Sequence, residues 1–261
     1  MRADQLLKQL FTQYNRSQIQ SMIQHGKIQF LDSQGHWQTV TKASQMFSED
    51  YLDSFKFRIE DSEWNKFVSR AGIKLSGALN EFEIDVANLV CLDVGLSTGG
   101  FSDCLLQSGA KKIMGIDVGR EQLHPQLQGN PKLLAVDKVN AREPLPEDSL
   151  ATFFGKDQHL FDFIVVDVSF ISLDKIIGNI CNYLAPGGYL LTLVKPQFEL
   201  GAEALNKKGV VKNEVDPYSA VEKNLEIFTG QNLKILGNCL SQITGDDGNK
   251  EFFIYAQKSS H

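Results

Sequence analysis

The feature that most constrains the fold is a series of five mainly apolar runs separated by more polar segments. They are residues 89–94, 112–117, 132–137, 162–168 and 188–195. Four runs end at an acidic residue or one position past it, and the fifth ends at Lys195. Such runs suit strands that are buried on both faces, as in a parallel sheet. Segments with helical spacing lie between or after them, at 100–109, 120–128, 171–184 and 217–229. Strand–helix alternation of this length predicts a doubly wound α/β sheet.

The two ends of the chain depart from this alternation. Residues 233–243 and 250–257 flank a turn rich in Gly and Asp, which predicts a terminal antiparallel pair of strands. The first 40 residues contain two short helical segments and a hairpin pattern, at 3–12, 17–26, 27–30 and 37–40. We therefore expect a small N-terminal α+β domain with its linker over residues 1–60, and a larger domain over 61–261.

Charge is unevenly distributed along the chain. The formal net charge is −6, yet the first 48 residues hold five Lys or Arg against two Asp. A basic head on an acidic body is compatible with an RNA-reading module attached to a catalytic domain.

Composition also limits the compartment and the chemistry. No apolar run reaches the roughly 18–20 residues that span a bilayer, and the N-terminus does not read as a signal peptide. The cysteines are widely spaced, with no C-x-x-C pair and no neighbouring His: Cys91, Cys104, Cys181 and Cys239. We expect reduced, mostly buried thiols, no metal site, a cytoplasmic protein, and neither a membrane nor an obligate protein partner.

The strongest local motif is LDVGLSTGGF at residues 92–101. A buried strand there runs into a glycine-rich turn that opens a helix, where free backbone amides meet a ligand. The dinucleotide pattern G-x-G-x-x-G is absent, and the acidic-x-Gly start suits S-adenosylmethionine, whose methionine end carries both an ammonium and a carboxylate. An ordinary tight turn is the alternative interpretation. The candidate cofactor contacts in this motif are Asp93, Gly95, Ser97, Thr98, Gly99, Gly100 and Phe101.

Acidic residues recur at successive predicted strand ends. A carboxylate at Asp117 suits the two ribose hydroxyls of an adenosine, and one at Asp137 suits the adenine amino group. Asp167 ends the fourth run beside the same crevice. Each alone reads equally well as a solvated acid, but their recurrence favours a nucleoside ligand. Lys195 is unusual at the end of a buried strand, because burying an unpaired ammonium is costly. It is either paired, used in the chemistry, or extended to solvent.

Five segments together resemble a known family. SRAGIKL, LDVGLSTGGFSD, IVVDVSF, LVKPQFE and GNKEFF occur in this order and resemble the FtsJ-like RNA ribose methyltransferases. The whole chain resembles the TlyA (haemolysin A) family, in which a small RNA-binding domain precedes an FtsJ-like catalytic domain. The resemblance implies a Rossmann-like class I methyltransferase sheet, mostly parallel with an antiparallel C-terminal strand. Leu96 departs from the family pattern, which usually has Ala in that place.

The resemblance also implies roles for individual residues. It implies a catalytic tetrad of Lys74, Asp167, Lys195 and Glu251. Our hypothesis is that Lys195 contacts and deprotonates a ribose 2′-hydroxyl, that Asp167 holds Lys195, and that Glu251 pairs with Lys74. The expected partner is ribosomal RNA or a ribosomal subunit. Candidate RNA contacts are Arg2, Arg16, Lys27 and Arg70, and Lys207 and Lys208 lie on a loop that suits substrate or phosphate.

Three other functions remain open at this point. A membrane-active haemolysin would need a spanning or strongly basic amphipathic segment, which the sequence lacks. A methyltransferase of small molecules would have no use for an RNA-reading domain. A non-catalytic RNA-binding or assembly factor would not need all four tetrad candidates.

Overall fold

The computed structural model describes residues 1–12, 14, 16–59, 66–155, 160–245 and 247–259, which separate into two compact units. The first unit ends at Arg70 and the second begins at Ala71. The sequence suggested a boundary near residue 60, and the acidic stretch 60–63 behind that expectation lies outside the described residues. Arg70 belongs to the first unit, where its Nη1 donates a hydrogen bond to Ser21 Oγ (3.2 Å).

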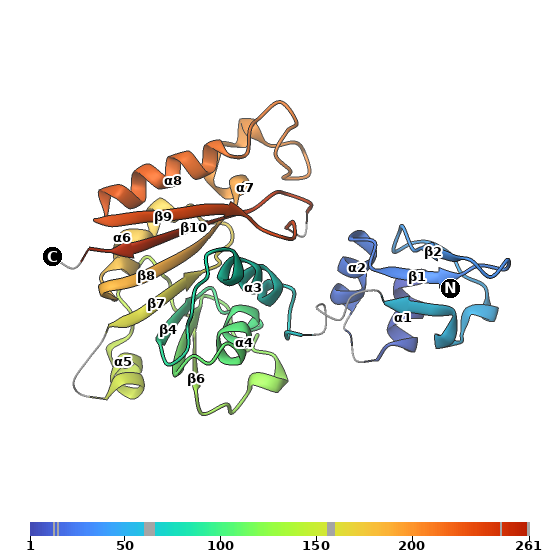
Figure 1. Ribbon diagram of the computed structural model, residues 1–261, viewed down its shortest axis with the longest axis horizontal. Helices are drawn as coiled ribbons and strands as arrows, with labels where there is room; N and C mark the ends of the chain where they lie inside the picture. Colours follow the sequence, from blue (N-terminus) through green and yellow to red (C-terminus); the bar gives the residue numbers. More distant parts are fainter. Residues whose placement is uncertain (13, 15, 60–65, 156–159, 246, 260–261) are drawn as a thin grey trace. The chain divides into compact units, whose positions relative to one another are not determined.

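The first unit combines two helices with a small antiparallel sheet in the order β2-β1-β3 (Figure 1). Its elements are α1 (Ala3–Leu10), α2 (Arg16–Gln24), β1 (Ile28–Leu31), β2 (Trp37–Thr39) and β3 (Phe57–Ile59). The helices and the β1–β2 hairpin lie where the sequence predicted them. Aromatic rings fill the space beside the sheet, with Phe47 and Phe57 at a centroid distance of 5.2 Å.

The second unit is built on a seven-stranded sheet in the order β6-β5-β4-β7-β8-β10-β9 (Figure 1). The strands are β4 (Val90–Val94), β5 (Lys112–Asp117), β6 (Leu133–Asp137), β7 (Phe161–Val166), β8 (Leu184–Val194), β9 (Leu233–Leu240) and β10 (Phe252–Lys258). Neighbours from β6 to β8 are parallel, whereas β10 is antiparallel to both β8 and β9. The chain continues from β4 to β5 on one side and returns to β7 on the other. Ligands bind outside the carboxyl ends of the strands at such a reversal.

Helices cover both faces of this sheet. On one face α3 (Ala71–Glu81) packs against α4 (Gly100–Gln107), and the Phe101 ring of α4 stacks on Phe253 of β10. The other face carries α5 (Glu147–Phe154), α6 (Ile177–Cys181) and α8 (Ser219–Gly230), which share the main buried apolar cluster with the strands. The short helix α7 (Pro196–Glu199) follows β8 directly.

This architecture confirms the predicted fold class, a mostly parallel sheet with an antiparallel C-terminal strand. Two helical predictions were wrong in extent. Segment 120–128 forms only a 3-10 turn at Pro125–Leu127, and segment 171–184 yields a 3-10 turn followed by the five-residue α6. Helix α6 ends at Cys181, before the predicted end of segment 171–184, because β8 already begins at Leu184. Helices α3, α5 and α7 were not predicted.

Two further features bear on the sequence expectations. In the described part of the chain, no helix combines the length and apolarity needed to cross a membrane. The four cysteines are thiols, of which Cys91, Cys104 and Cys181 are buried. Burial raises the pKa of the Cys181 thiol to about 11, so it stays protonated at neutral pH.

Candidate active site

A cavity of about 350 Å³ opens at the carboxyl ends of β4, β5 and β7. The residues that line it include Gly95, Ser97, Asp117, Asn140, Asp167 and Phe170. Ser97 (φ +46°) and Phe170 (φ +63°) are non-glycine residues held in the left-handed region. Such conformations persist only where the surroundings enforce them, and they cluster at functional sites.

Gly95 lets the turn after β4 approach the segment after β7. Its φ is +92°, and a Cβ at this position would lie 2.1 Å from the backbone oxygen of Asp167. The backbone N–H of Asp167 also donates to the Val94 oxygen at 2.9 Å. Only glycine fits so close an approach, so Gly95 shapes the cavity wall.

Leu96 is accommodated by the neighbouring strand. Its side chain is buried, and a Cβ on Gly115 of β5 would lie 2.6 Å from Leu96 Cδ1. The glycine in β5 therefore provides the space for a side chain larger than the alanine usual in the family.

Asp93 lies beneath the glycine-rich turn and does not line the cavity. Its side chain is fully buried, and Ser102 Oγ donates to its Oδ2 at 2.6 Å. Within the described residues, Oδ1 has no hydrogen-bond partner. Burial raises the pKa of Asp93 to about 7, the hydrogen bond from Ser102 opposes the shift, and the charge of Asp167 adds to it. A carboxyl group in this state gains from a nearby cation, which fits the ammonium of a methionine moiety.

The two other strand-end acids differ in position. Asp117 lines the cavity, and its two oxygens accept from the backbone N–H groups of Ser97 (2.8 Å) and Gly119 (2.7 Å). Asp137 is exposed outside the cavity lining, and its Oδ2 accepts from the Glu121 N–H at 2.8 Å. The adenine contact proposed for Asp137 stays a prediction.

The remaining residues of the glycine-rich motif lie away from the cavity lining. Gly99 is the N-cap of α4, and a Cβ there would meet Leu127 Cδ1 at 2.4 Å. Gly100 and Phe101 are buried in the first turn of α4, and Thr98 is exposed. These residues orient the turn, and their direct cofactor contacts stay predictions.

The first candidate pair joins Lys74 of α3 to Glu251, the residue before β10. Lys74 Nζ lies 2.5 Å from Glu251 Oε2, and both side chains are at most 6% exposed. The two residues are 177 positions apart in the chain. A buried pair of this kind holds two elements together, because either charge alone would be strongly unfavourable.

The second pair joins Lys195, the residue after β8, to Asp167, the residue after β7. Lys195 Nζ lies 2.5 Å from Asp167 Oδ1 and 3.0 Å from Ser169 Oγ. The Lys195 side chain is 12% exposed. Its ammonium group is therefore both paired and accessible, as expected of a group that meets a substrate.

Strand register brings the two pairs to one edge of the sheet. Val166 of β7 pairs with Thr192 of β8, and Val194 of β8 pairs with Phe252 of β10. Asp167, Lys195 and Glu251 are each adjacent in sequence to these strand ends. The sheet thus gathers residues from three neighbouring strands, with Lys74 reaching them from α3.

Sequence reasoning missed a buried acid that braces this edge. Glu199 of α7 accepts from the Leu173 N–H (2.8 Å) and from Ser172 Oγ (2.5 Å), and Lys223 of α8 lies 3.5 Å from its Oε2. Its side chain is 2% exposed. Glu199 therefore ties the segment after β7 to the helix that follows Lys195. The available signal in the sequence was an acidic residue four positions after Lys195, in the motif LVKPQFE.

An exposed aromatic residue at the cavity rim was also missed. Phe170 is 90% exposed, lines the cavity, and contacts the Phe198 ring at a centroid distance of 5.1 Å. Exposure of so large an apolar side chain beside a cavity is typical of a binding surface.

In the first unit, two predicted RNA contacts surround a buried acid. Arg16 Nη2 lies 2.7 Å and Arg2 Nε 3.1 Å from the carboxylate of Asp4, which is fully buried. Although burial acts in the opposite direction, hydrogen bonds from Arg16, Arg2 and Gln20 hold the pKa of Asp4 well below its ordinary value. Both arginines thus have a structural role, while their side chains remain about half exposed, at 45% and 57%.

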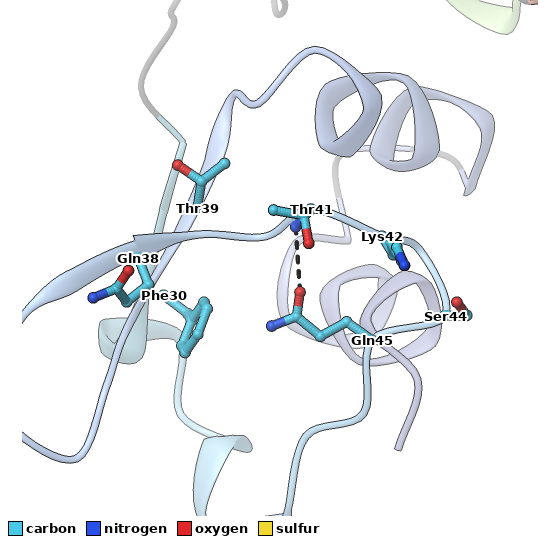
Figure 2. Close-up of a pocket in the computed structure, with 7 residues that line it drawn as sticks. All are labelled: Phe30, Gln38, Thr39, Thr41, Lys42, Ser44 and Gln45. Carbon is cyan, nitrogen blue, oxygen red and sulfur yellow. Dashed lines mark hydrogen bonds between the residues drawn. The ribbon is translucent and has the colours of Figure 1, made fainter.

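The first unit has a polar cavity of its own, of about 450 Å³ (Figure 2). It is lined by Phe30, Gln38, Thr39, Thr41, Lys42, Ser44 and Gln45. Two of these residues are joined by a hydrogen bond, in which Gln45 Oε1 accepts from the Thr41 N–H at 3.2 Å. The predicted RNA contacts Lys27 and Arg70 are half-buried and lie outside this lining.

Comparison with known proteins identifies the family of this chain. The FtsJ-like methyltransferase family matches residues 67–258, which include all four members of the two pairs. The chain belongs to this family. The match confirms the resemblance carried by the five motifs, and with it S-adenosylmethionine as the cofactor.

Individual relatives match over most of the chain. Mycobacterium tuberculosis TlyA, named as a 16S/23S rRNA (cytidine-2′-O)-methyltransferase, is 36% identical over 200 residues, covering 76% of this chain and 70% of that protein. Bacillus subtilis YqxC is 38% identical over 190 residues, covering 73% of this chain and 65% of YqxC, slightly under two thirds. A solved structure of a hemolysin-named protein from Streptococcus thermophilus has a TM-score of 0.70 at 31% identity, covering 99% of this chain and 88% of that one.

Proposed function

We propose that this protein transfers a methyl group from S-adenosylmethionine to a ribose 2′-hydroxyl of ribosomal RNA. The observation that carries the proposal is the gathering of Lys74–Glu251 and Lys195–Asp167 at one edge of the sheet, beside the cavity. The printed activity of the TlyA relative supports ribosomal RNA as the substrate class. An isolated RNA or an assembled ribosomal subunit, in the cytoplasm, is the substrate in this proposal.

The residues at the cavity fit S-adenosylmethionine. Gly95 and Ser97 line the cavity together with Asp117, whose carboxylate suits ribose hydroxyls. Outside the lining, beneath the turn, the buried Asp93 has one oxygen with no hydrogen-bond partner among the described residues, and a carboxylate there suits an ammonium. When bound, S-adenosylmethionine supplies an electrophilic methyl group. The protein must then hold a hydroxyl oxygen in line with that methyl group and remove its proton.

Lys195 is the residue that acts on the hydroxyl in this proposal. In this proposal the Lys195 ammonium first loses a proton to solvent. Its neutral Nζ then accepts the proton of the 2′-hydroxyl as the oxygen bonds to the methyl carbon and that carbon separates from the cofactor sulfur. Asp167 and Ser169 fix the amine by contacts of 2.5 and 3.0 Å. The Lys74–Glu251 pair supports the side of the site formed by α3 and β10, and it places a second cation at the same edge of the sheet.

The RNA contacts follow from two surfaces described separately. At the cavity rim, Phe170 offers an exposed ring on which the base of a splayed nucleotide stacks. In the first unit, the basic surplus lies in residues 1–48, which hold five Lys or Arg against two Asp. The exposed parts of Arg2 and Arg16 are the phosphate contacts in this proposal. Lys27 and Arg70 are the further RNA contacts in this proposal.

Mass-spectrometric mapping of ribosomal RNA tests the proposed function. Purified protein is incubated with S-adenosylmethionine and either naked 16S and 23S RNA or ribosomal subunits. The proposal predicts new 2′-O-methylated nucleotides that appear only with both protein and cofactor. Methylation on a base, or an unchanged RNA, contradicts it.

A further inference from the structure

The segment between α7 and α8 contains a tight hairpin that carries two lysines at its tip. Leu205 pairs with Val211, and the Asn206 N–H donates to the Val210 oxygen at 2.8 Å. Asn206 Oδ1 accepts from the Lys208 N–H at 2.8 Å, and Gly209 has a φ of +76°. The turn is therefore closed by its own backbone and by Asn206, with Lys207 and Lys208 between.

A buried amide fixes this hairpin to the body of the second unit. Asn249 is 2% exposed, its Oδ1 accepts from the Val211 N–H (3.0 Å), and its Nδ2 donates to the Gly209 oxygen (3.2 Å). At the base, Lys212 Nζ donates to the Glu203 oxygen at 2.8 Å. Asn249 thus holds the returning side of the hairpin at Gly209 and Val211.

The anchor belongs to the same turn that delivers a candidate catalytic residue. Asn249 is two positions before Glu251, whose carboxylate pairs with Lys74. The backbone oxygen of Asn249 accepts from the Gly245 N–H at 2.8 Å. Figure 1 shows the loop between α7 and α8 above the turn that joins β9 and β10. The position of the two lysines is therefore coupled to the edge of the sheet that carries the tetrad.

The charge at the tip is exposed. Lys207 and Lys208 are both exposed, and in the described part of the chain neither ammonium has an acidic partner within ion-pair distance. The formal net charge of the whole chain is −6, so binding of an anion depends on local groups of cations such as this exposed pair. Exposed lysines are often only solvated, but an anchored pair loses less conformational freedom on binding a fixed anion.

We propose that Lys207 and Lys208 bind the phosphate backbone of the RNA beside the nucleotide that enters the active site. This inference rests on the proposed function, because it assigns an RNA contact to the catalytic unit itself. Phosphate contacts orient an RNA without reading its sequence. Two such contacts next to the tetrad would set which ribose reaches Lys195.

The test is the salt dependence of RNA binding by the full chain, with a ribosomal RNA fragment that contains the mapped methylation site as the probe. The variant is Lys207→Gln with Lys208→Gln. We expect the Kd to rise roughly tenfold at low salt, and the slope of log K against log[salt] to fall by about 1–2, as for two lost phosphate contacts. Affinity for S-adenosylmethionine should stay unchanged, because neither lysine lines the cavity.

Two matched variants separate charge and position from general effects. Lys111→Gln with Lys234→Gln removes two exposed lysines outside the catalytic edge and should leave the slope unchanged. Lys207→Arg with Lys208→Arg keeps the charges and should bind like the unaltered protein. Asn249→Ala keeps both lysines but releases the hairpin, and should weaken binding by less than the double Gln variant.

The outcomes distinguish this inference from the proposed function. If the Lys207/Lys208 variant matches the Lys111/Lys234 variant in both affinity and slope, while the unaltered protein methylates RNA, only this inference is overturned. If the unaltered protein neither binds nor methylates ribosomal RNA, both are overturned.

Discussion

Lys74 Nζ contacts Glu251 Oε2 at 2.5 Å across a separation of 177 residues, and the pair is almost completely buried. The contact links the helix before the first strand of the large sheet to the start of its last strand. The catalytic residues can therefore come together only after both ends of the large unit have folded.

Removing one member of this pair should destabilise the protein. Lys74→Met leaves Glu251 as an uncompensated buried charge, and we expect a loss of about 3–5 kcal/mol in the free energy of unfolding. The double variant Lys74→Met with Glu251→Leu should recover most of that stability, because it removes both charges. Urea unfolding measures the free energy of unfolding of each variant. Methyl transfer should stay low in both variants. A double variant with full activity would show that the pair is only structural.

Glu199 should act as a positioning residue. Glu199→Gln weakens the brace from Lys223 while it keeps an acceptor for the Leu173 N–H. We expect kcat to fall more than KM for RNA rises, because the segment carrying Asp167 and Ser169 moves relative to Lys195. Glu203→Gln, an exposed acid in the following turn, is the matched control. Equal kinetics for the two variants in steady-state assays would argue against the brace.

Asp93 should make stability depend on pH. Its pKa is raised from 3.8 to about 7 on folding, so the folded carboxyl keeps its proton where the unfolded one is ionised. The associated stabilisation is present below about pH 4 and is lost as pH rises towards 7. Asp93→Asn stays neutral and keeps an acceptor for Ser102, so its stability relative to the unaltered protein should improve from pH 5 to pH 8. If the free energy of unfolding varied with pH in the same way for the two proteins, the pKa of Asp93 would not be raised by folding.

Phe170 should contribute to binding of the target nucleotide rather than to folding. Phe170→Ala removes an exposed ring, so we expect little change in unfolding temperature. Loss of one base–aromatic stack should raise KM for RNA by roughly 5- to 150-fold, corresponding to about 1–3 kcal/mol. Phe170→Trp should retain stacking. Phe55→Ala serves as a control, because Phe55 is also strongly exposed but lies in the first unit.

The sequence was sufficient to predict what depends on local pattern. The apolar runs located all five strands of the parallel part, and the strand-end positions of Asp167 and Lys195 followed from them. The pairing of Lys74 with Glu251 came from the family resemblance, because no local pattern links residues so far apart.

What the sequence could not supply depends on tertiary contacts. Asp137 was assigned to the crevice from its place at a strand end, but its side chain turns to the Glu121 backbone. Arg2 and Arg16 looked like free surface cations until Asp4 was found buried between them. Asn249 binds Gly209 and Val211, which lie 40 and 38 residues before it, and no local sequence pattern links positions so far apart.

The most direct test of the proposed chemistry compares Lys195→Ala with the unaltered protein in two assays on the same preparation. Calorimetry measures the Kd for S-adenosylmethionine, and mass spectrometry measures 2′-O-methylated nucleotide formed on ribosomal RNA. We expect a cofactor Kd within about twofold of the unaltered value and a turnover lowered by roughly 100-fold or more. Near-normal turnover by the variant would contradict it.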